Sequence, residues 1–345
     1  MQTEAMVMNA TGGPEVLTRA TIEIPDPGPR EVRIRVRAVA VNHIDIWARR
    51  GLPHFRYEFP HRLGADISGV VEALGPGAVN AKVGDEIVLN PGLSCGVCEK
   101  CLLGTDVFCR NYRIMGENTQ GGYTRHFNVP DVNLLPKPKK LSFEEAAALP
   151  LCFLTAWQMV VEKAKVKTGQ TILVQAAGSG VSSAAIQIAK MLGARVITTT
   201  STEEKAKRAK ELGADDVIDY TKQDFVAEVK KLTNKRGVDA VIEHVGGEVF
   251  AKSILAAAWG GRVVTCGATT GFTPEIDLRH VFFRQVELLG STMGSKGDLF
   301  DILRHVEAGR LRPVVDRVLP LWSAVEAHRL LEDRKVFGKV VLAVD

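Results

Sequence analysis

Four of the six cysteines stand close together in the segment NPGLSCGVCEKCLLGTDVFC, residues 90–109. They are Cys95, Cys98, Cys101 and Cys109, in a stretch rich in Gly, Asn and Pro. Four thiolates this near in sequence can form one tetrahedron, a geometry that suits zinc. An iron–sulfur cluster would use similar thiols in different surroundings, and disulfides are disfavoured in a reducing cytoplasm. We predict one Zn²⁺, and because four thiolates leave no position for water or substrate, we predict that it is structural.

A second candidate site is the turn AAGSGVSSAA, residues 176–185, which follows the strand-like segment TILVQAA. Small residues in such a turn let the backbone approach a pyrophosphate, and the free N–H groups of the following helix favour its negative charge. As a Gly-x-Gly-x-x-Gly fingerprint the turn is degenerate, with serine at two glycine positions, and it would also serve tight strand–helix packing alone. The residues predicted to bind the cofactor here are Gly178, Ser179, Gly180 and Val181.

The next strand-like segment ends in ITTTSTEEK, where a site for NAD would place an acidic side chain on the ribose 2′-hydroxyl. Thr200 stands there, and Ser201 and Lys205 follow. Two hydroxyls and a cation suit the 2′-phosphate of NADP, although Lys205 is also explained as an ordinary charge in the first turn of a helix. We therefore favour NADPH over NADH.

These sites need two kinds of scaffold. Residues 6–130 contain short strand-like runs broken by Gly and Pro, and EVRIRVRAVAVN alternates apolar residues with a basic outer face. Ser142 with Glu145 forms a capping-box pattern at the start of a helix over SFEEAAALPLCFLTAWQMVVEKAKV. Strands then alternate with helices at 182–192 and 203–212, as a doubly wound parallel sheet requires. The fold class is α/β, in two domains.

Composition limits the partners of the chain. Its 345 residues are 46% hydrophobic and 24% charged, and the net charge of +4 is scattered, so we expect neither nucleic acid nor membrane as a partner. No apolar run approaches the length of a membrane helix, and the N-terminus lacks the pattern of a secretory signal. We expect a cytoplasmic protein with a small-molecule substrate.

The chain as a whole resembles the medium-chain dehydrogenase/reductase superfamily, which includes zinc alcohol dehydrogenases and quinone oxidoreductases. The resemblance rests on the cysteine segment, the nucleotide turn and the segments GGPEVL, GADISGVVEALGPGA, VGDEIVLNPG, GGYTRHFNVP, LTAWQMV and GKVVL. It implies a GroES-like, β-rich catalytic domain over 1–151 and 294–345, and a Rossmann domain over 152–293. It also implies a structural zinc in the cysteine lobe and a homodimer or homotetramer.

The departures from the zinc-dependent members carry information about mechanism. Where those members have zinc ligands, this chain has Asn42, Ala65, Asp66 and Leu151, and the relay hydroxyl is replaced by Ile44. The chain therefore resembles the quinone-oxidoreductase and enoyl-reductase branches, which work without catalytic metal but usually lack the cysteine lobe. A catalytic site rebuilt from other side chains is the alternative; its candidate ligands are His43, His61, Asp66 and Cys152.

Without a metal, conjugate hydride transfer is the easier reaction, because the charge spreads into an enolate or phenolate that hydrogen-bond donors can stabilise. We predict that Asn42 polarises or orients the carbonyl, and that water or a network through Asp45 supplies the proton. A structural cap or ion pair is the equal alternative for Asp45.

The resemblance also implies the remaining cofactor contacts. It places His43 and Lys339 near the pyrophosphate, Thr155 near the nicotinamide, Tyr220 and Lys205 near the 2′-phosphate, and Gly267 and Ala268 at the nicotinamide ribose. The expected activity is NADPH-dependent reduction of an activated alkene or quinone. A zinc alcohol dehydrogenase with unconventional ligands and a nucleotide-binding protein with little turnover are the alternatives.

Overall fold

The computed structural model describes residues 1–52 and 55–345. These residues form two compact units. The first contains Met1–Leu151, Ser295–Glu307 and Pro313–Asp345, and the second contains Cys152–Gly294 and Ala308–Arg312. The chain therefore leaves the first unit after Leu151, returns to it at Ser295, and passes briefly through the second unit again before it completes the first.

The first unit is built on a seven-stranded sheet in the order β16-β17-β3-β4-β5-β9, with β8 also paired to β3. The strands are β3 (Glu31–Ala40), β4 (Asp66–Leu74), β5 (Glu86–Leu89), β8 (His126–Pro130), β9 (Leu134–Pro136), β16 (Val315–Pro320) and β17 (Lys339–Ala343). Two smaller sheets pair β1 (Gln2–Met8) with β2 (Leu17–Glu23), and β6 (Gly92–Leu93) with β7 (Arg113–Ile114). Because β17 pairs with β3, the end of the sequence lies beside residues near position 40.

The predicted alternation in β3 is present with one exception. Val32, Ile34 and Val36 are buried, whereas Arg35 and Arg37 face solvent. Arg33 was expected on the solvated face but is buried, because its guanidinium donates hydrogen bonds to the Pro25 carbonyl (2.6 Å) and to Asp26 (3.2 Å). A charged side chain can be buried when its donors find such partners.

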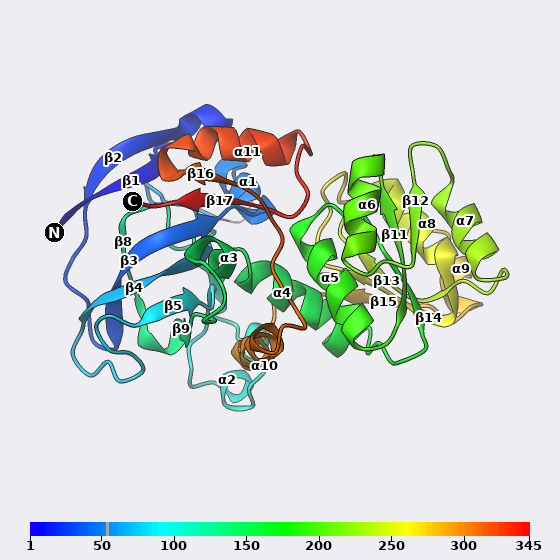
Figure 1. The fold of residues 1–345 in the computed structure, drawn as a ribbon, viewed down its shortest axis with the longest axis horizontal. Helices are drawn as coiled ribbons and strands as arrows, with labels where there is room; N and C mark the ends of the chain where they lie inside the picture. The colour runs from blue at the N-terminus through cyan, green and yellow to red at the C-terminus, as the bar shows by residue number, and fades with distance from the viewer. Residues whose placement is uncertain (53–54) are drawn as a thin grey trace. The chain divides into compact units, whose positions relative to one another are not determined.

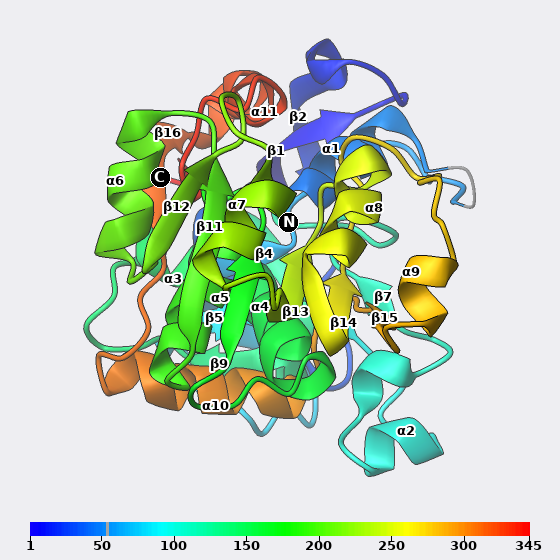
Figure 2. The ribbon, with the colours of Figure 1, turned by 90° about the vertical axis from the view of Figure 1, so that its right-hand side faces the viewer.

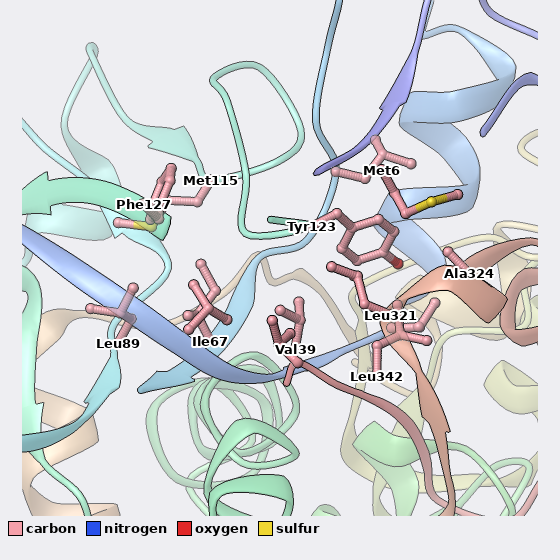
Figure 3. Close-up of a cluster of buried hydrophobic side chains, with 14 of the residues drawn as sticks. Met6, Val39, Ile67, Leu89, Met115, Tyr123, Phe127, Leu321, Ala324 and Leu342 are labelled. Carbon is pink, nitrogen blue, oxygen red and sulfur yellow. The ribbon is translucent and has the colours of Figure 1, made fainter. Parts of the chain in front are cut away.

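The core of the first unit lies between this sheet and the segments that fold over it (Figure 3). Val39 and Ile67 come from the paired strands β3 and β4, and Leu342 comes from β17. Met115 and Phe127 lie together at one end of the cluster, Met6 and Ala324 lie toward the other, and Tyr123 lies between them (Figure 3). Each such side chain contributes about 1.5–3 kcal/mol when fully buried, so this cluster fixes the sheet on which the site residues stand.

The helical segment after Ser142, which ends the first part of the first unit and begins the second unit, differs from the single long helix predicted there. The capping box is present, since the Ser142 hydroxyl accepts from the Glu145 N–H (3.2 Å) and the Glu145 carboxylate from the Ser142 N–H (3.1 Å). However, α3 (Phe143–Ala147) ends before α4 (Pro150–Trp157), and Gln158–Lys163 forms a π-helical turn. Proline lacks an N–H and cannot continue a helix, but it is well suited to begin one. Besides α3, the helices of the first unit are α1 (His43–Arg50), α2 (Glu99–Leu102), α10 (Lys296–Glu307) and α11 (Ala324–Glu332), with 3₁₀ turns at Pro14–Val16, Asp106–Phe108, Asp131–Asn133 and Leu321–Ser323.

As predicted, the second unit contains a parallel sheet; its six strands lie in the order β12-β11-β10-β13-β14-β15 (Figure 2). Its strands are β10 (Thr171–Val174), β11 (Arg195–Thr200), β12 (Asp216–Asp219), β13 (Val238–Glu243), β14 (Ala257–Thr265) and β15 (Glu287–Gly290). Helices α5 (Gly180–Met191) and α6 (Glu203–Glu211) cover one face, and α7 (Phe225–Leu232) and α8 (Gly247–Ala256) cover the other (Figure 1); α9 (Arg279–Phe282) precedes β15. The order reverses between β10 and β13, which is where such sheets bind ligands. None of the described helices is long and apolar enough to cross a membrane.

Candidate active site and metal centre

The four cysteine thiols of residues 95–109 converge as the spacing predicts. All four sulfur atoms lie within 4.8 Å of one another. The Sγ–Sγ distances are 3.5 Å for Cys98–Cys101, 3.6 Å for Cys95–Cys109 and 3.8 Å for Cys95–Cys101. A tetrahedral zinc with bonds of about 2.3 Å has sulfur–sulfur edges of about 3.8 Å, so the donor set fits this ion. Backbone N–H groups of Val97 and Cys98 lower the pKa of Cys95 to about 6, which favours the thiolate that a metal needs.

Helix α10 anchors the cysteine lobe to the rest of the first unit. The Asp106 carboxylate accepts from the backbone N–H of Lys296 (2.9 Å) and from the Ser94 hydroxyl (3.1 Å). The Lys296 ammonium in turn donates to the Ser94 hydroxyl (3.3 Å). This positive side chain therefore stands next to a centre that would carry a net negative charge when four thiolates bind Zn²⁺. The sequence alone did not indicate this contact, which spans 190 residues.

A second polar cluster is formed by Asn42, Asp66 and Lys339, which are 4%, 0% and 4% exposed. The Val41 N–H donates to the Val340 carbonyl (2.9 Å), and this pairing brings β17 beside the start of α1. The Lys339 ammonium donates to the Asn42 side-chain oxygen and to Asp66 Oδ2 (3.2 Å). The Asn42 amide nitrogen donates to the same Asp66 oxygen (3.0 Å) and to the Ala40 carbonyl (3.3 Å). The result is a buried ion pair held together by a shared amide.

This cluster does not fit a divalent metal. Of the four positions where zinc-dependent relatives have ligands, only Asp66 offers an anionic donor, because Asn42 is neutral and Ala65 and Leu151 have no side-chain ligand atom. Both oxygens of Asp66 are engaged, Oδ1 by the Leu151 N–H (2.8 Å) and Oδ2 by Asn42 and Lys339. A divalent cation would also meet the charge of Lys339 at short range. Asn42, Asp66 and Lys339 therefore suit a buried ion pair and do not suit a divalent metal that would act as a Lewis acid.

The other candidate ligands do not gather around Asp66. Within residues 1–52 and 55–345, the four-cysteine group is the only set of three or more His, Cys, Asp or Glu side chains close enough to hold a metal. His61 is buried, and its Nε2 lies 3.2 Å from the Gly116 carbonyl. Cys152 is buried, as expected for a small apolar side chain. His43 is exposed at the first position of α1.

Asp45 caps helix α1, the alternative that the sequence left open. Its carboxylate accepts from the backbone N–H groups of Asn42 (2.7 Å) and Gly64 (2.9 Å), so it fixes the backbone of Asn42 and of the segment that leads into Asp66. Burial raises the pKa of Asp45 to about 7, although the two backbone hydrogen bonds oppose the shift. Both carboxylate oxygens of Asp45 accept hydrogen bonds from backbone N–H groups. This geometry supports a positioning role for Asp45 and gives no support to the predicted proton-supply network.

The raised pKa of Asp45 makes stability depend on pH. The native carboxyl keeps its proton up to about pH 7, whereas the unfolded chain releases it near pH 4. The native state therefore binds more protons in this window, and its free energy of unfolding should fall as pH rises from 4 to 7, by about 4 kcal/mol at most. Urea unfolding at several pH values would measure this slope, and Asp45→Asn should show a smaller one, because it lacks the Asp45 part and keeps that of Glu117, whose pKa burial also raises to about 7. Equal slopes in both proteins would contradict the assignment.

The nucleotide turn between β10 and α5 has the geometry of a helix N-terminus prepared for an anion. Ser179 is the N-cap of α5, and its hydroxyl accepts from the Ser182 N–H (3.0 Å). Gly178 precedes it, and Gly180 and Val181 begin the helix. Sequence reasoning missed His244, which follows β13 and whose Nε2 lies 3.0 Å from the Ser179 hydroxyl and 2.9 Å from the Ser182 hydroxyl. The His244 imidazole therefore lies at the ends of the neighbouring strands β10 and β13, where the strand order of the sheet reverses.

The residues predicted at the 2′-phosphate lie at the carboxyl ends of β11 and β12. Thr200 ends β11, and its carbonyl accepts from the Tyr220 N–H (3.1 Å). The Thr200 hydroxyl is buried and has no hydrogen-bond partner among the described residues. Ser201 follows, and Lys205 lies in the first turn of α6, next to the capping residue Thr202. These residues therefore share one edge of the sheet with the turn of α5.

Three further residues that were predicted to contact the cofactor, Gly267, Ala268 and Thr155, lie in the second unit. Gly267 and Ala268 follow β14, and the Thr265 hydroxyl donates to the Gly267 carbonyl (3.0 Å). The backbone of Ala268 lies close to Gly246, because a Cβ added to Gly246 would lie 2.8 Å from the Cα of Ala268. Thr155 is buried in α4. Lys339 was predicted at the pyrophosphate; the structure instead engages its ammonium with Asp66 and Asn42.

Comparison with known proteins decides the family. The Alcohol dehydrogenase GroES-like domain matches residues 28–139, and the Zinc-binding dehydrogenase family matches residues 180–308. An NAD-dependent alcohol dehydrogenase of Saccharolobus solfataricus is 32% identical over 94% of this chain and 96% of its own. The chain is a medium-chain dehydrogenase/reductase.

Other relatives of this medium-chain dehydrogenase/reductase have different activities. The Homo sapiens quinone oxidoreductase is 29% identical, covering 96% of this chain and 94% of its own. A 2-haloacrylate reductase of a Burkholderia species is 30% identical, covering 98% of both chains. A crystal structure of an NAD-dependent alcohol dehydrogenase is 56% identical with a TM-score of 0.96, covering 99% of this chain and 100% of that one. The protein is therefore an oxidoreductase with a GroES-like and a Rossmann domain, and its four-cysteine group lies within the residues that match the Alcohol dehydrogenase GroES-like domain.

Proposed function

We propose that the protein is an NADPH-dependent reductase of activated alkenes or quinones that works without a catalytic metal and carries one structural Zn²⁺. The observation that carries the proposal is the Asn42–Asp66–Lys339 cluster, in which a lysine ammonium stands among the positions where zinc-dependent relatives have ligands. When bound, NADPH supplies a hydride, and the chain must stabilise the charge that this hydride creates on the substrate.

The chemistry that suits this cluster is conjugate reduction. The hydride adds to the β carbon of an unsaturated carbonyl, the alkene electron pair moves into an enolate, and the α carbon takes a proton from water. A fixed positive charge near the enolate oxygen lowers the barrier because it is already in place when the charge develops. In this scheme Lys339 supplies the charge. Asn42 is a positioning residue, since both of its N–H groups are already donated to Asp66 and Ala40.

A substrate screen combined with zinc analysis tests the proposal. NADPH oxidation should be faster with an enone, an enoyl thioester or a quinone than with a matched saturated ketone. The same sample should contain one zinc per chain. Two zincs per chain, or preferential turnover of the ketone, would overturn the metal-independent mechanism.

A zinc-dependent alcohol dehydrogenase or carbonyl reductase is the second candidate. It is favoured by the 56% identical crystal structure described as an NAD-dependent alcohol dehydrogenase. This candidate predicts oxidation of alcohols with NAD⁺ and loss of activity when a chelator removes a catalytic metal. The first proposal predicts that brief chelation, which leaves the structural zinc in place, does not change the rate.

For the cofactor we propose NADPH, supported by Thr200, Ser201 and Lys205 and by the lack of an acidic side chain at these positions. Replacing Lys205 with alanine should raise the Kd for NADPH about tenfold and leave the Kd for NADH unchanged, because only NADPH carries the 2′-phosphate. Fluorescence titration of both cofactors measures this difference. Lys207→Ala on the same helix is the matched control. An equal effect on both cofactors would contradict the assignment.

We also propose that the protein assembles with copies of itself through the edge of its parallel sheet. Strand β15 is the last strand of that sheet and is mostly exposed. Several large apolar side chains of β14 and of the segment between β14 and β15 are also exposed, among them Trp259, Phe272, Leu278, Phe282 and Phe283. Light scattering should give at least twice the chain mass of 37.5 kDa, and Leu288→Lys in the edge strand should lower it. A monomeric wild-type protein would contradict this proposal.

A further inference from the structure

A cavity of about 320 Å³ lies within the first unit, away from the Asn42–Asp66–Lys339 cluster and the cysteines. Its apolar wall includes Leu93, Met115, Phe127 and Val129. Met115 and Phe127 stand together at one end of the core (Figure 3). The volume is at the lower end of the range for small-molecule pockets, which are commonly apolar with a few polar groups.

Two buried donors that line this cavity, one from Arg62 and one from Thr119, have no hydrogen-bond partner among the described residues. Arg62 forms no side-chain hydrogen bond or ion pair with any residue of 1–52 or 55–345, and its Nε is buried. The hydroxyl of Thr119 is also buried without a partner within the described chain. The guanidinium carbon of Arg62 lies 6.0 Å from the centre of the Phe127 ring. Buried donors are normally satisfied, so two of them in one cavity indicate a missing acceptor.

The remaining polar side chains of the cavity do not supply that acceptor. The Glu31 carboxylate accepts from the Gly28 N–H (2.9 Å), and it is not within ion-pair distance of Arg62. Gln120 accepts from the backbone N–H of Arg62 (3.0 Å) and donates to the Pro60 carbonyl. Asn128 donates to the Pro25 carbonyl (3.0 Å). Burial without an anion also lowers the pKa of Arg62 to about 10, in line with a desolvated cation.

We propose that this cavity is a binding site for a small monocarboxylate with an apolar body. The carboxylate would accept from Arg62 and Thr119, and the body would cover the wall that includes Leu93, Met115 and Phe127. A monoanion suits the site better than an inorganic phosphate, because Glu31 also lines the cavity and would repel a second negative charge. A phosphate would also leave the apolar wall exposed to water.

Calorimetric titration with hexanoate tests this proposal, and hexanamide is the uncharged probe of nearly the same shape. Hexanoate should bind the wild-type protein about tenfold or more tightly than hexanamide, since a hydrogen bond to a charged group is worth more than one to a neutral group. Arg62→Gln should remove this preference, and Thr119→Val should reduce it severalfold. Arg329→Gln, which changes an exposed arginine on α11, should bind hexanoate as the wild type does.

Three outcomes would overturn the proposal. They are equal binding of hexanoate and hexanamide, unchanged binding of hexanoate by Arg62→Gln, and displacement of hexanoate by equimolar inorganic phosphate. If Arg62→Gln does not fold, the comparison of the two probes on the wild-type protein and on Thr119→Val still decides the question. None of these measurements depends on turnover, so the result is independent of the proposed reductase activity.

Discussion

Replacing Cys101 with serine should reduce the zinc content from one equivalent per chain to less than about a tenth of that value. Cys101, like Cys95, takes part in two of the three short Sγ–Sγ contacts; it lies 3.5 Å from Cys98 and 3.8 Å from Cys95. A serine hydroxyl is a poor substitute for a thiolate on zinc. Because loss of a structural metal is among the most damaging single changes, the free energy of unfolding of the first unit should fall by more than about 4 kcal/mol.

Metal analysis and urea unfolding of the same preparation measure these two effects. Cys266→Ser is the matched control, because Cys266 lies outside the cysteine lobe and this variant should keep its zinc. NADPH binding should survive in Cys101→Ser, since the nucleotide turn belongs to the second unit, which has its own core. Full zinc content in Cys101→Ser would contradict the four-cysteine assignment.

The features that sequence predicted well depend on residues near one another along the chain. The cysteine lobe spans 95–109, so spacing alone was enough to bring the thiols together. The helices predicted over 182–192 and 203–212 match α5 and α6 to within two residues, because their apolar residues repeat with the helical period. The capping box at Ser142 is local in the same sense, but the helix after it stops short because Pro150 begins a new one.

The features that sequence missed depend on distant residues. Asn42 and Lys339 are 297 positions apart, and only the pairing of β17 with β3 brings them together. The sequence did contain a signal for this cluster. A lysine in a short apolar strand needs a buried anion as its partner. Asp66 is such an acid, because it stands where the family pattern has an acidic residue, although the histidine of that pattern is replaced by Ala65. His244 was missed for the same reason, since it reaches Ser179 from a strand that follows 65 residues later.

Lys339→Met should lower kcat with an enone about 100- to 1000-fold, which is the usual effect of removing one group that stabilises a developing oxyanion. The same change should lower the free energy of unfolding by about 3–5 kcal/mol, because it leaves Asp66 buried and unpaired. Stopped-flow turnover and urea unfolding measure the two effects. The Kd for NADPH should stay within about twofold of wild type. If Lys339 bound the pyrophosphate instead, its replacement would mainly raise the Kd for NADPH.

The double variant Lys339→Met/Asp66→Asn separates catalysis from stability. It removes both charges, so the desolvation penalty of an unpaired carboxylate disappears and most of the lost stability should return. The rate should stay low, because no positive charge remains beside the substrate oxygen. Recovery of the rate together with the stability would show that Lys339 serves only the fold. A rate that stays low in a stable protein, with the NADPH Kd unchanged, would be the result that a charge-stabilising role for the ammonium requires.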